Sequence, residues 1–169
     1  MPSNIAPVAE AARFADQLER SLNGGAWHGP ALAEALAGLT ADEADFRPFA
    51  GAHTIRELVF HLDFWIEETR RRIEAPPDDR PDPETDWPSG KVAKGRQDAT
   101  WKAALAHLEE SHRRLKATVL ALDEAGFDRR VAGSDPTLRG MLLGLLQHNA
   151  YHGGQIVLLA KAARSRRAS

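Results

Sequence analysis

The feature that most constrains this chain is a long apolar segment near its C-terminus with helical spacing. Members of the series recur in steps of three and four residues, at Leu138, Met141, Leu145, His148, His152, Gln155 and Leu159. This spacing is typical of the buried face of a helix packed against other helices. Three successive members are polar, and burying such groups without partners costs about 1–3 kcal/mol each. The segment therefore predicts either a local weakness or a functional site.

The remaining sequence predicts an all-α fold. Helical segments are expected at residues 6–23, 30–39, 40–45, 54–74, 98–124 and 135–163. Capping boxes at Thr40/Glu43 and Thr54/Glu57 begin two of these helices, and Asp135 is the expected N-cap of the last. Strand-like alternation is nowhere sustained. We expect one helical domain over residues 1–169, a four-helix bundle with short connecting helices.

Two segments are expected to lie outside the packed helices. The connection 75–96, between the second and third long helices, holds five of the ten prolines and Trp87. Loops of this length are uncommon in compact domains, so it is either a functional cover or a disordered segment. Residues 164–169, three of which are arginines, are expected to form a flexible tail.

Composition narrows the classes of function. The net charge is −2, and acidic and basic residues alternate along the chain, which disfavours nucleic acid and anionic membranes as partners. The chain has no cysteine, so it can form neither a disulfide nor a thiolate metal site. The sequence also contains no apolar run long enough to span a membrane and no secretion signal. We therefore expect a cytoplasmic protein.

His148 and His152 are four residues apart, so they project from one face of a helix at a separation that allows both imidazoles to bind one metal ion. Residue 149 is Asn rather than the Glu that serves as general base in zinc proteases, which disfavours a protease. A third ligand must come from another helix. His61 is the best candidate, because it lies beside the apolar face of the second long helix.

Other side chains compete for roles around this site. Glu57 could complete a site of two histidines and one carboxylate, although its capping role already explains it. His112 points inward and is either a fourth ligand or a hydrogen-bonded core histidine. Gln155 could orient a ligand or a bound water, and Trp87 could line a cover over the pocket.

The chain resembles a known bacterial family at this point, the DinB-like or YfiT-like metalloenzymes. The matching segments are 27–30 (WHGP), 53–61 (HTIRELVFH) with Trp65, 86–88 (DWP) and 148–156 (HNAYHGGQI). The resemblance implies a four-helix bundle with a divalent metal ion, often zinc or nickel, held by His61, His148 and His152. Members often carry Asp where this chain has Asn149. The family includes bacillithiol S-transferases and mycothiol-dependent isomerases.

Three functions fit these observations. The first is a metal-dependent enzyme with an open three-histidine site, such as a transferase of low-molecular-weight thiols; zinc or nickel is the expected metal, with iron or manganese as alternatives. The second is a metal-dependent hydrolase with Glu57 as base. The third is a non-catalytic bundle that the metal stabilises. The expected partners are a small-molecule substrate, which could be a low-molecular-weight thiol, and a second copy in a homodimer.

Overall fold

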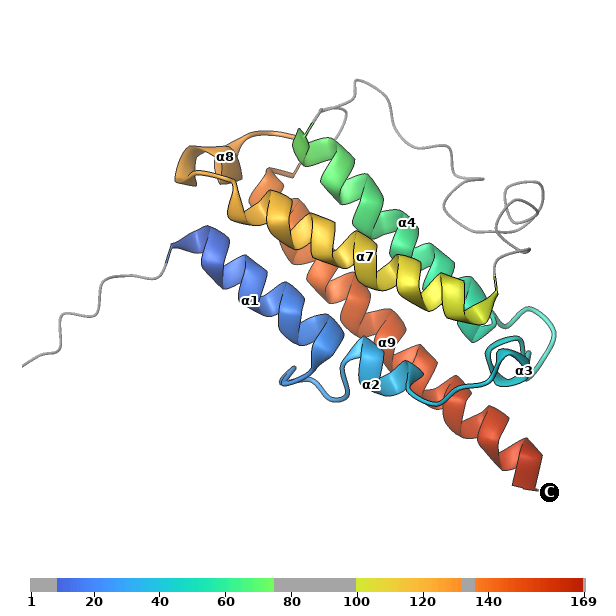
Figure 1. Ribbon diagram of the computed structural model, residues 1–169. Coiled ribbons are helices and arrows are strands. Elements are labelled where there is room, and N and C mark those ends of the chain that lie inside the picture. Colours follow the sequence, from blue (N-terminus) through green and yellow to red (C-terminus); the bar gives the residue numbers. More distant parts are fainter. Residues whose placement is uncertain (1–8, 75–99, 132–135, 169) are drawn as a thin grey trace, which may run out of the picture.

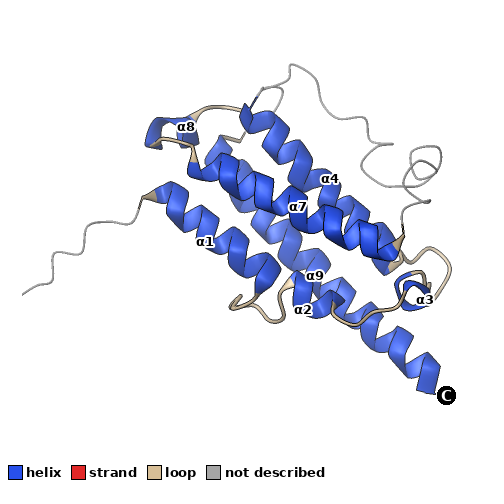
Figure 2. Cartoon of the chain, in the orientation of Figure 1, coloured by secondary structure: helices blue, strands red, loops and turns tan. Residues whose placement is uncertain are grey.

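The computed structural model describes residues 9–74, 100–131 and 136–168 of the chain, and these residues fold into helices without any strand (Figures 1 and 2). The helices are α1 (Glu10–Asn23), α2 (Leu32–Leu36), α3 (Ala41–Ala44), α4 (Ile55–Glu74), α7 (Trp101–Leu120), α8 (Glu124–Asp128) and α9 (Leu138–Ala168). The all-α prediction is confirmed. The expected cover over 75–96, with Trp87, lies outside the described residues, as does Asp135.

Side-chain caps explain where two of the helices begin. The Thr54 hydroxyl accepts a hydrogen bond from the Glu57 amide (3.1 Å), and the Glu57 carboxylate accepts one from the Thr54 amide (2.9 Å). Thr40 and Glu43 form the same reciprocal pair at the start of α3. Each pair satisfies two backbone N–H groups that a helix end leaves without a partner. Both capping boxes expected from the sequence are therefore confirmed.

The ends of two long helices differ from the prediction. Helix α7 stops at Leu120, and the chain begins a separate short helix, α8, where the Asp123 carboxylate accepts a hydrogen bond from the Gly126 amide. Helix α9 begins after Thr137, whose hydroxyl accepts a hydrogen bond from the Gly140 amide, so Pro136 precedes the helix. At its other end α9 continues to Ala168. Residues 164–168, expected as part of a tail, are therefore helical, and the helix end predicted at residue 163 is wrong.

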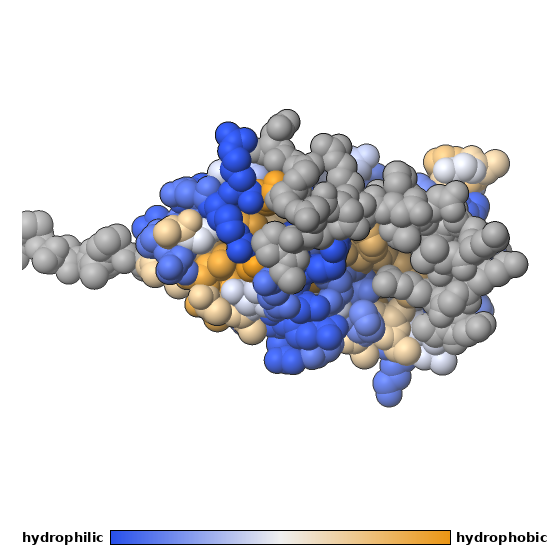
Figure 3. All heavy atoms as spheres, turned by 90° about the horizontal axis from the view of Figure 1, so that it is seen from above, coloured by the Kyte–Doolittle hydropathy of each residue, from blue (hydrophilic) through white to orange (hydrophobic). Residues whose placement is uncertain are grey.

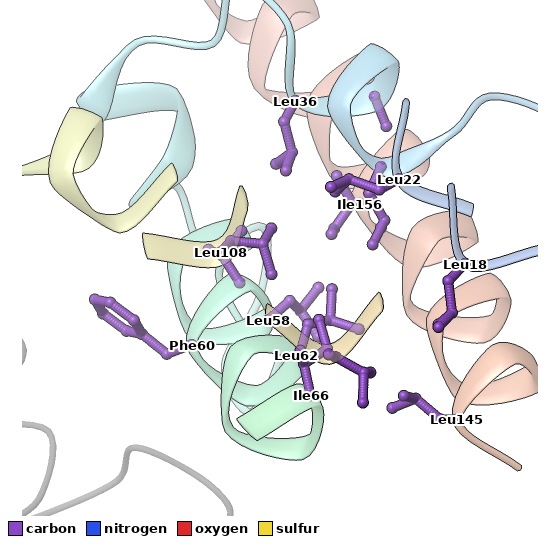
Figure 4. Close-up of a cluster of buried hydrophobic side chains, with 14 of the residues drawn as sticks. Leu18, Leu22, Leu36, Leu58, Phe60, Leu62, Ile66, Leu108, Leu145 and Ile156 are labelled. Atoms are coloured by element: carbon purple, nitrogen blue, oxygen red, sulfur yellow. The ribbon is translucent and has the colours of Figure 1, made fainter. Parts of the chain in front are cut away.

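Four long helices provide most of the packing. Helix α7 packs against both α1 and α4, and α9 packs against α4, α1 and the short helices α2, α3 and α8. In Figure 1, α4 and α7 run in the same direction, whereas α1 and α9 run in the opposite one. Leucine and isoleucine side chains from five of these helices meet in one apolar cluster, with Leu18, Leu36, Leu62, Leu108 and Ile156 among its members (Figure 4).

The buried face of α9 is turned by one residue from the predicted series. The helix buries Leu138, Leu142, Leu145, Asn149, His152, Gly153, Ile156, Ala160 and Ala163. His148 and Gln155 are only half-buried, beside this line rather than on it. The rotation places these two polar side chains at the edge of the packed core, where they can contact both the protein interior and a ligand.

Among the described residues visible from above, hydrophilic and hydrophobic side chains lie next to each other (Figure 3). Among the described residues, no helix is long and apolar enough to cross a membrane.

Candidate metal centre

Two long helices bring three histidines together. His61 lies on α4 between the buried side chains Leu58 and Leu62, and only 4% of it is exposed. His148 and His152 project from α9, one turn apart, and 5% of His152 is exposed. Because α4 packs directly against α9, the three imidazoles meet between them. The sequence expectation that His61 faces the other pair is thus matched by the geometry.

The three imidazoles are spaced as metal ligands would be. One possible ligand atom from each histidine lies within 4.8 Å of the other two. The Nε2 atoms of His61 and His148 are 2.8 Å apart. Ring centroids are 4.4 Å apart for His148 and His152, and 4.8 Å apart for the two pairs that include His61. Three imidazole nitrogens this close together could hold a metal ion.

Gln155 orients one of the three imidazoles and determines which of its nitrogens carries the proton. Nδ1 of His152 lies 2.8 Å from the Gln155 side-chain oxygen. Since an amide oxygen only accepts hydrogen bonds, the His152 Nδ1 carries the proton and donates it. Nε2 of His152 therefore keeps its lone pair, as a metal ligand must, and the ring is held in a fixed orientation.

The surroundings of His148 favour its neutral form. Burial, together with the neighbouring His152 and His61, lowers the pKa of His148 to about 4. Only neutral histidine can donate a lone pair to a metal ion, so His148 is ready to bind one at neutral pH.

Buried polar atoms at the site have unmet hydrogen-bonding capacity. Asn149 is 1% exposed, and neither atom of its amide forms a well-aligned hydrogen bond within the described residues; the same is true of His148 Nδ1. The Asn149 amide lies close enough to raise the pKa of His148 slightly against the effect of burial. The buried Asn149 amide and His148 Nδ1 therefore lie near each other with hydrogen-bonding capacity to spare.

Aromatic rings surround the imidazoles. The Trp65 ring on α4 lies 6.2 Å from His148, and the Tyr151 ring on α9 lies 4.9 Å from His152, each roughly edge to face. Phe64 packs against Trp65 in turn. Trp65 therefore provides an apolar surface beside the half-buried His148, and such surfaces strengthen electrostatic interactions by excluding water.

Two of the other candidates lie elsewhere. Both carboxylate oxygens of Glu57 are engaged, one by the Arg47 guanidinium and the other by the Thr54 amide. His112 is buried between α7 and α1, where burial lowers its pKa to about 4 and its Nε2 has no partner among the described residues. Neither belongs to the histidine group that could hold a metal ion.

One buried acid was not expected from the sequence. The Asp63 carboxylate on α4 is buried and lies 2.9 Å from Nδ1 of His107 on α7, which is otherwise exposed. The Ser111 hydroxyl lies 3.3 Å from the same nitrogen. Because serine and aspartate share one ring nitrogen, this cluster cannot work as a Ser-His-Asp triad, in which they contact opposite nitrogens. Nothing in the local sequence pairs residues so far apart.

The sequence profile of the DinB superfamily matches residues 26–156. The chain belongs to the DinB superfamily. This DinB chain matches no curated protein and no solved structure. The matched range contains His61, His148, His152 and Gln155, so the whole candidate centre lies within the part of the chain that matches the superfamily.

Proposed function

We propose that His61, His148 and His152 hold a divalent metal ion and that the protein is a metal-dependent transferase of low-molecular-weight thiols. The observation that carries the proposal is the convergence of three imidazole ligand atoms within 4.8 Å of one another. Three protein ligands are typical of catalytic rather than structural zinc sites, because a position is left for a substrate. Imidazole donors suit zinc and nickel, and also iron.

The proposal also concerns the arrangement of the four long helices. We propose that α1, α4, α7 and α9 form one four-helix bundle domain, with the metal between α4 and α9. Metal sites in bundles are commonly built from side chains on facing helices, which is how these three histidines are arranged.

The chain's own residues would prepare the reaction. Gln155 holds the ring of His152 and fixes its proton on Nδ1. The Trp65 ring lies beside His148 and would limit the access of water from that side. A divalent ion bound there would act as a Lewis acid that lowers the pKa of a thiol or water beside it.

The thiol has to come from outside the protein, since the chain has no cysteine. In the proposed transfer, the sulfur of the small thiol forms a bond to an electrophilic carbon. The leaving group departs with its electron pair, and the thiol proton passes to solvent. Hydrolysis by the same centre has less support, because its candidate base Glu57 already accepts hydrogen bonds from Arg47 and Thr54.

Metal content tests the first half of the proposal. Protein purified without added metal should contain about one divalent ion per chain by elemental analysis, and a His148→Ala variant should contain much less. The matched control is His107→Ala, which removes an exposed histidine outside the centre and should leave the metal content unchanged. Equal metal in the wild type and in His148→Ala would refute the site.

A cobalt-loaded sample tests the second half, because bound cobalt absorbs visible light whereas zinc does not. Adding L-cysteine or 2-mercaptoethanol should change the cobalt spectrum, and the same thiol should be consumed with chlorodinitrobenzene faster than in the His148→Ala variant. If the metal is present but neither thiol changes the spectrum or is consumed, the transferase form of the proposal is wrong while the metal site stands.

A further inference from the structure

The outer face of α9 is exposed and carries no charge over most of its length. Its exposed side chains follow one another in steps of three and four, at Gly144, Gln147, Tyr151, Gly154 and Leu158. The exposed fractions of Tyr151 and Leu158 are 65% and 68%. No Asp, Glu, Lys or Arg occurs between Arg139 and Lys161. We call this surface the α9 outer face.

Other helices expose charged residues instead. The exposed positions of α7 include Lys102, Glu109 and Arg113, and those of α1 include Asp16. The opposite side of α9 is covered by α1, α2, α3, α4 and α8. A helix that is apolar or uncharged all round is normally buried all round. The α9 outer face therefore has the character of a surface that packs against another helix, and the described helices leave it exposed.

We propose that this face binds the same face of a second copy of the chain, with the two α9 helices antiparallel and a two-fold axis close to Tyr151. The spacing of large and small residues supports this arrangement. Gly144 and Leu158 lie seven residues before and after Tyr151. A two-fold axis at Tyr151 therefore places Leu158 of each copy opposite Gly144 of the other, as a self-complementary interface requires.

The site opposite Leu158 has the shape of a hole between helices. Gly140, Leu143, Gly144 and Gln147 stand at the four positions that form such a hole. A Cβ atom at Gly144 would meet nothing within 4 Å, so the space above it is open. In a parallel pair, Leu158 would meet Leu158 and the glycines would face each other, which leaves the hole empty. The packing therefore favours the antiparallel pair.

The charges at the two ends of the face also fit an antiparallel pair. At the N-terminal end of α9, Arg139 forms ion pairs with both Glu10 and Asp128, so two carboxylates share one guanidinium there. At the other end Lys161 is exposed. Antiparallel packing brings Lys161 of one copy toward these carboxylates of the other, and it also places the helix dipoles in opposite directions. The excess carboxylate at one end favours a second copy, which brings Lys161 to it, over an anionic lipid surface, which it would repel.

Sedimentation of the full chain tests the proposal. Wild type should be a dimer. Leu158→Glu, which would bury a carboxylate at two equivalent places, should raise the dissociation constant about 100-fold or more. Gly144→Leu should also dissociate the dimer, by filling the hole. This variant keeps the monomer folded, because leucine favours a helix over glycine and the space at this position is open. The matched control is Ala117→Leu, at an exposed position of α7.

Disulfide cross-linking tests the direction of packing, since the chain has no cysteine of its own. Gly144→Cys and Leu158→Cys chains, oxidised separately, should form few cross-links, and an equal mixture of the two should cross-link readily. Cross-linking within each variant alone would indicate a parallel pair and overturn the proposed arrangement. A wild type that sediments as a monomer at every concentration, including one that binds phosphatidylglycerol vesicles, overturns the proposal, as does a dimer that both packing variants leave intact.

Discussion

At the scale of single residues, His112 is a buried histidine that lies outside the candidate metal centre. His112 is 1% exposed between α7 and α1, next to the ion pair of Glu19 and Lys116. Burial lowers its pKa to about 4, although Glu19 and a backbone hydrogen bond to Leu18 oppose the shift. His112 therefore stays neutral at pH 7 and is better suited to packing than to proton transfer there.

The stability of the protein should fall with acid partly because of His112. Its pKa is about 4 in the folded protein and 6.5 in the absence of burial, so the unfolded chain takes up a proton first as the pH falls. The stability that neutral His112 contributes is fully present above pH 6.5 and decreases progressively toward pH 4. Below pH 4 it does not change further, because both states then carry the proton. In urea titrations of metal-free protein, His112→Gln should reduce this slope between the two values. An equal slope in wild type and His112→Gln would contradict the assignment.

Gln155 should control metal affinity without binding the metal. Its oxygen accepts the His152 Nδ1 proton, and loss of such an orienting partner typically lowers metal affinity about 10–100-fold. Gln155→Leu should show this loss in competition with a chelator of known zinc affinity. Gln155→Glu, which can still accept the proton, should retain most of the affinity. A merely structural role for Gln155 would leave the affinity of both variants near wild type, as expected for the exposed control Gln17→Leu.

At the scale of helices, a capping box stabilises the start of α4, the helix that carries His61. Thr54 and Glu57 exchange hydrogen bonds across the first turn, and His61 follows one turn later. Replacing an N-cap threonine by alanine typically costs about 1 kcal/mol, because a backbone N–H loses its partner. Thr54→Ala should therefore lower the free energy of unfolding by about this amount in urea, whereas Thr54→Ser should keep most of it. An unchanged Thr54→Ala would mean that packing alone fixes this end of α4.

Helix signals that depend on neighbouring residues could be predicted from the sequence. The capping boxes at Thr40 and Thr54 were visible because both partners lie within one turn. The end of α7 could not be predicted. Leu122 continues the apolar spacing, which predicted a helix to residue 124, but Asp123 instead caps the separate helix α8. Where two signals overlap, the sequence does not show which one determines the helix boundary.

The candidate centre was predictable for a different reason. A pair of histidines one turn apart on an apolar helix is recognisable locally, and His61 could be chosen because few inward-facing histidines compete with it. The exact rotation of α9 was not predictable, since Met141 and Leu142 are both apolar and only packing against α4 and α1 decides which of them is buried. The contact of Asp63 with His107 likewise depends on how α4 meets α7.

At the scale of the whole molecule, a metal ion in the proposed centre would connect parts of the chain that are distant in sequence. His61 and His148 are 87 residues apart, and α4 and α9 are held together otherwise by apolar packing. An ion that binds only the folded state adds its binding free energy to stability, about 2.7 kcal/mol when the free metal concentration is about 100 times the dissociation constant. The effect should extend to global unfolding, because two long helices must separate before the ligands disperse.

Zinc at that excess should raise the melting temperature of metal-free protein by about 5–10 °C, given about 2–4 °C per kcal/mol for a chain of this size. EDTA should reverse the rise. His148→Ala should show almost no shift, since the two remaining imidazoles come from different helices and bind the ion far more weakly. The control His107→Ala should shift as wild type does, because His107 lies outside the centre. If zinc raised the melting temperature of His148→Ala as much as that of wild type, the stabilising ion would be bound elsewhere on the protein.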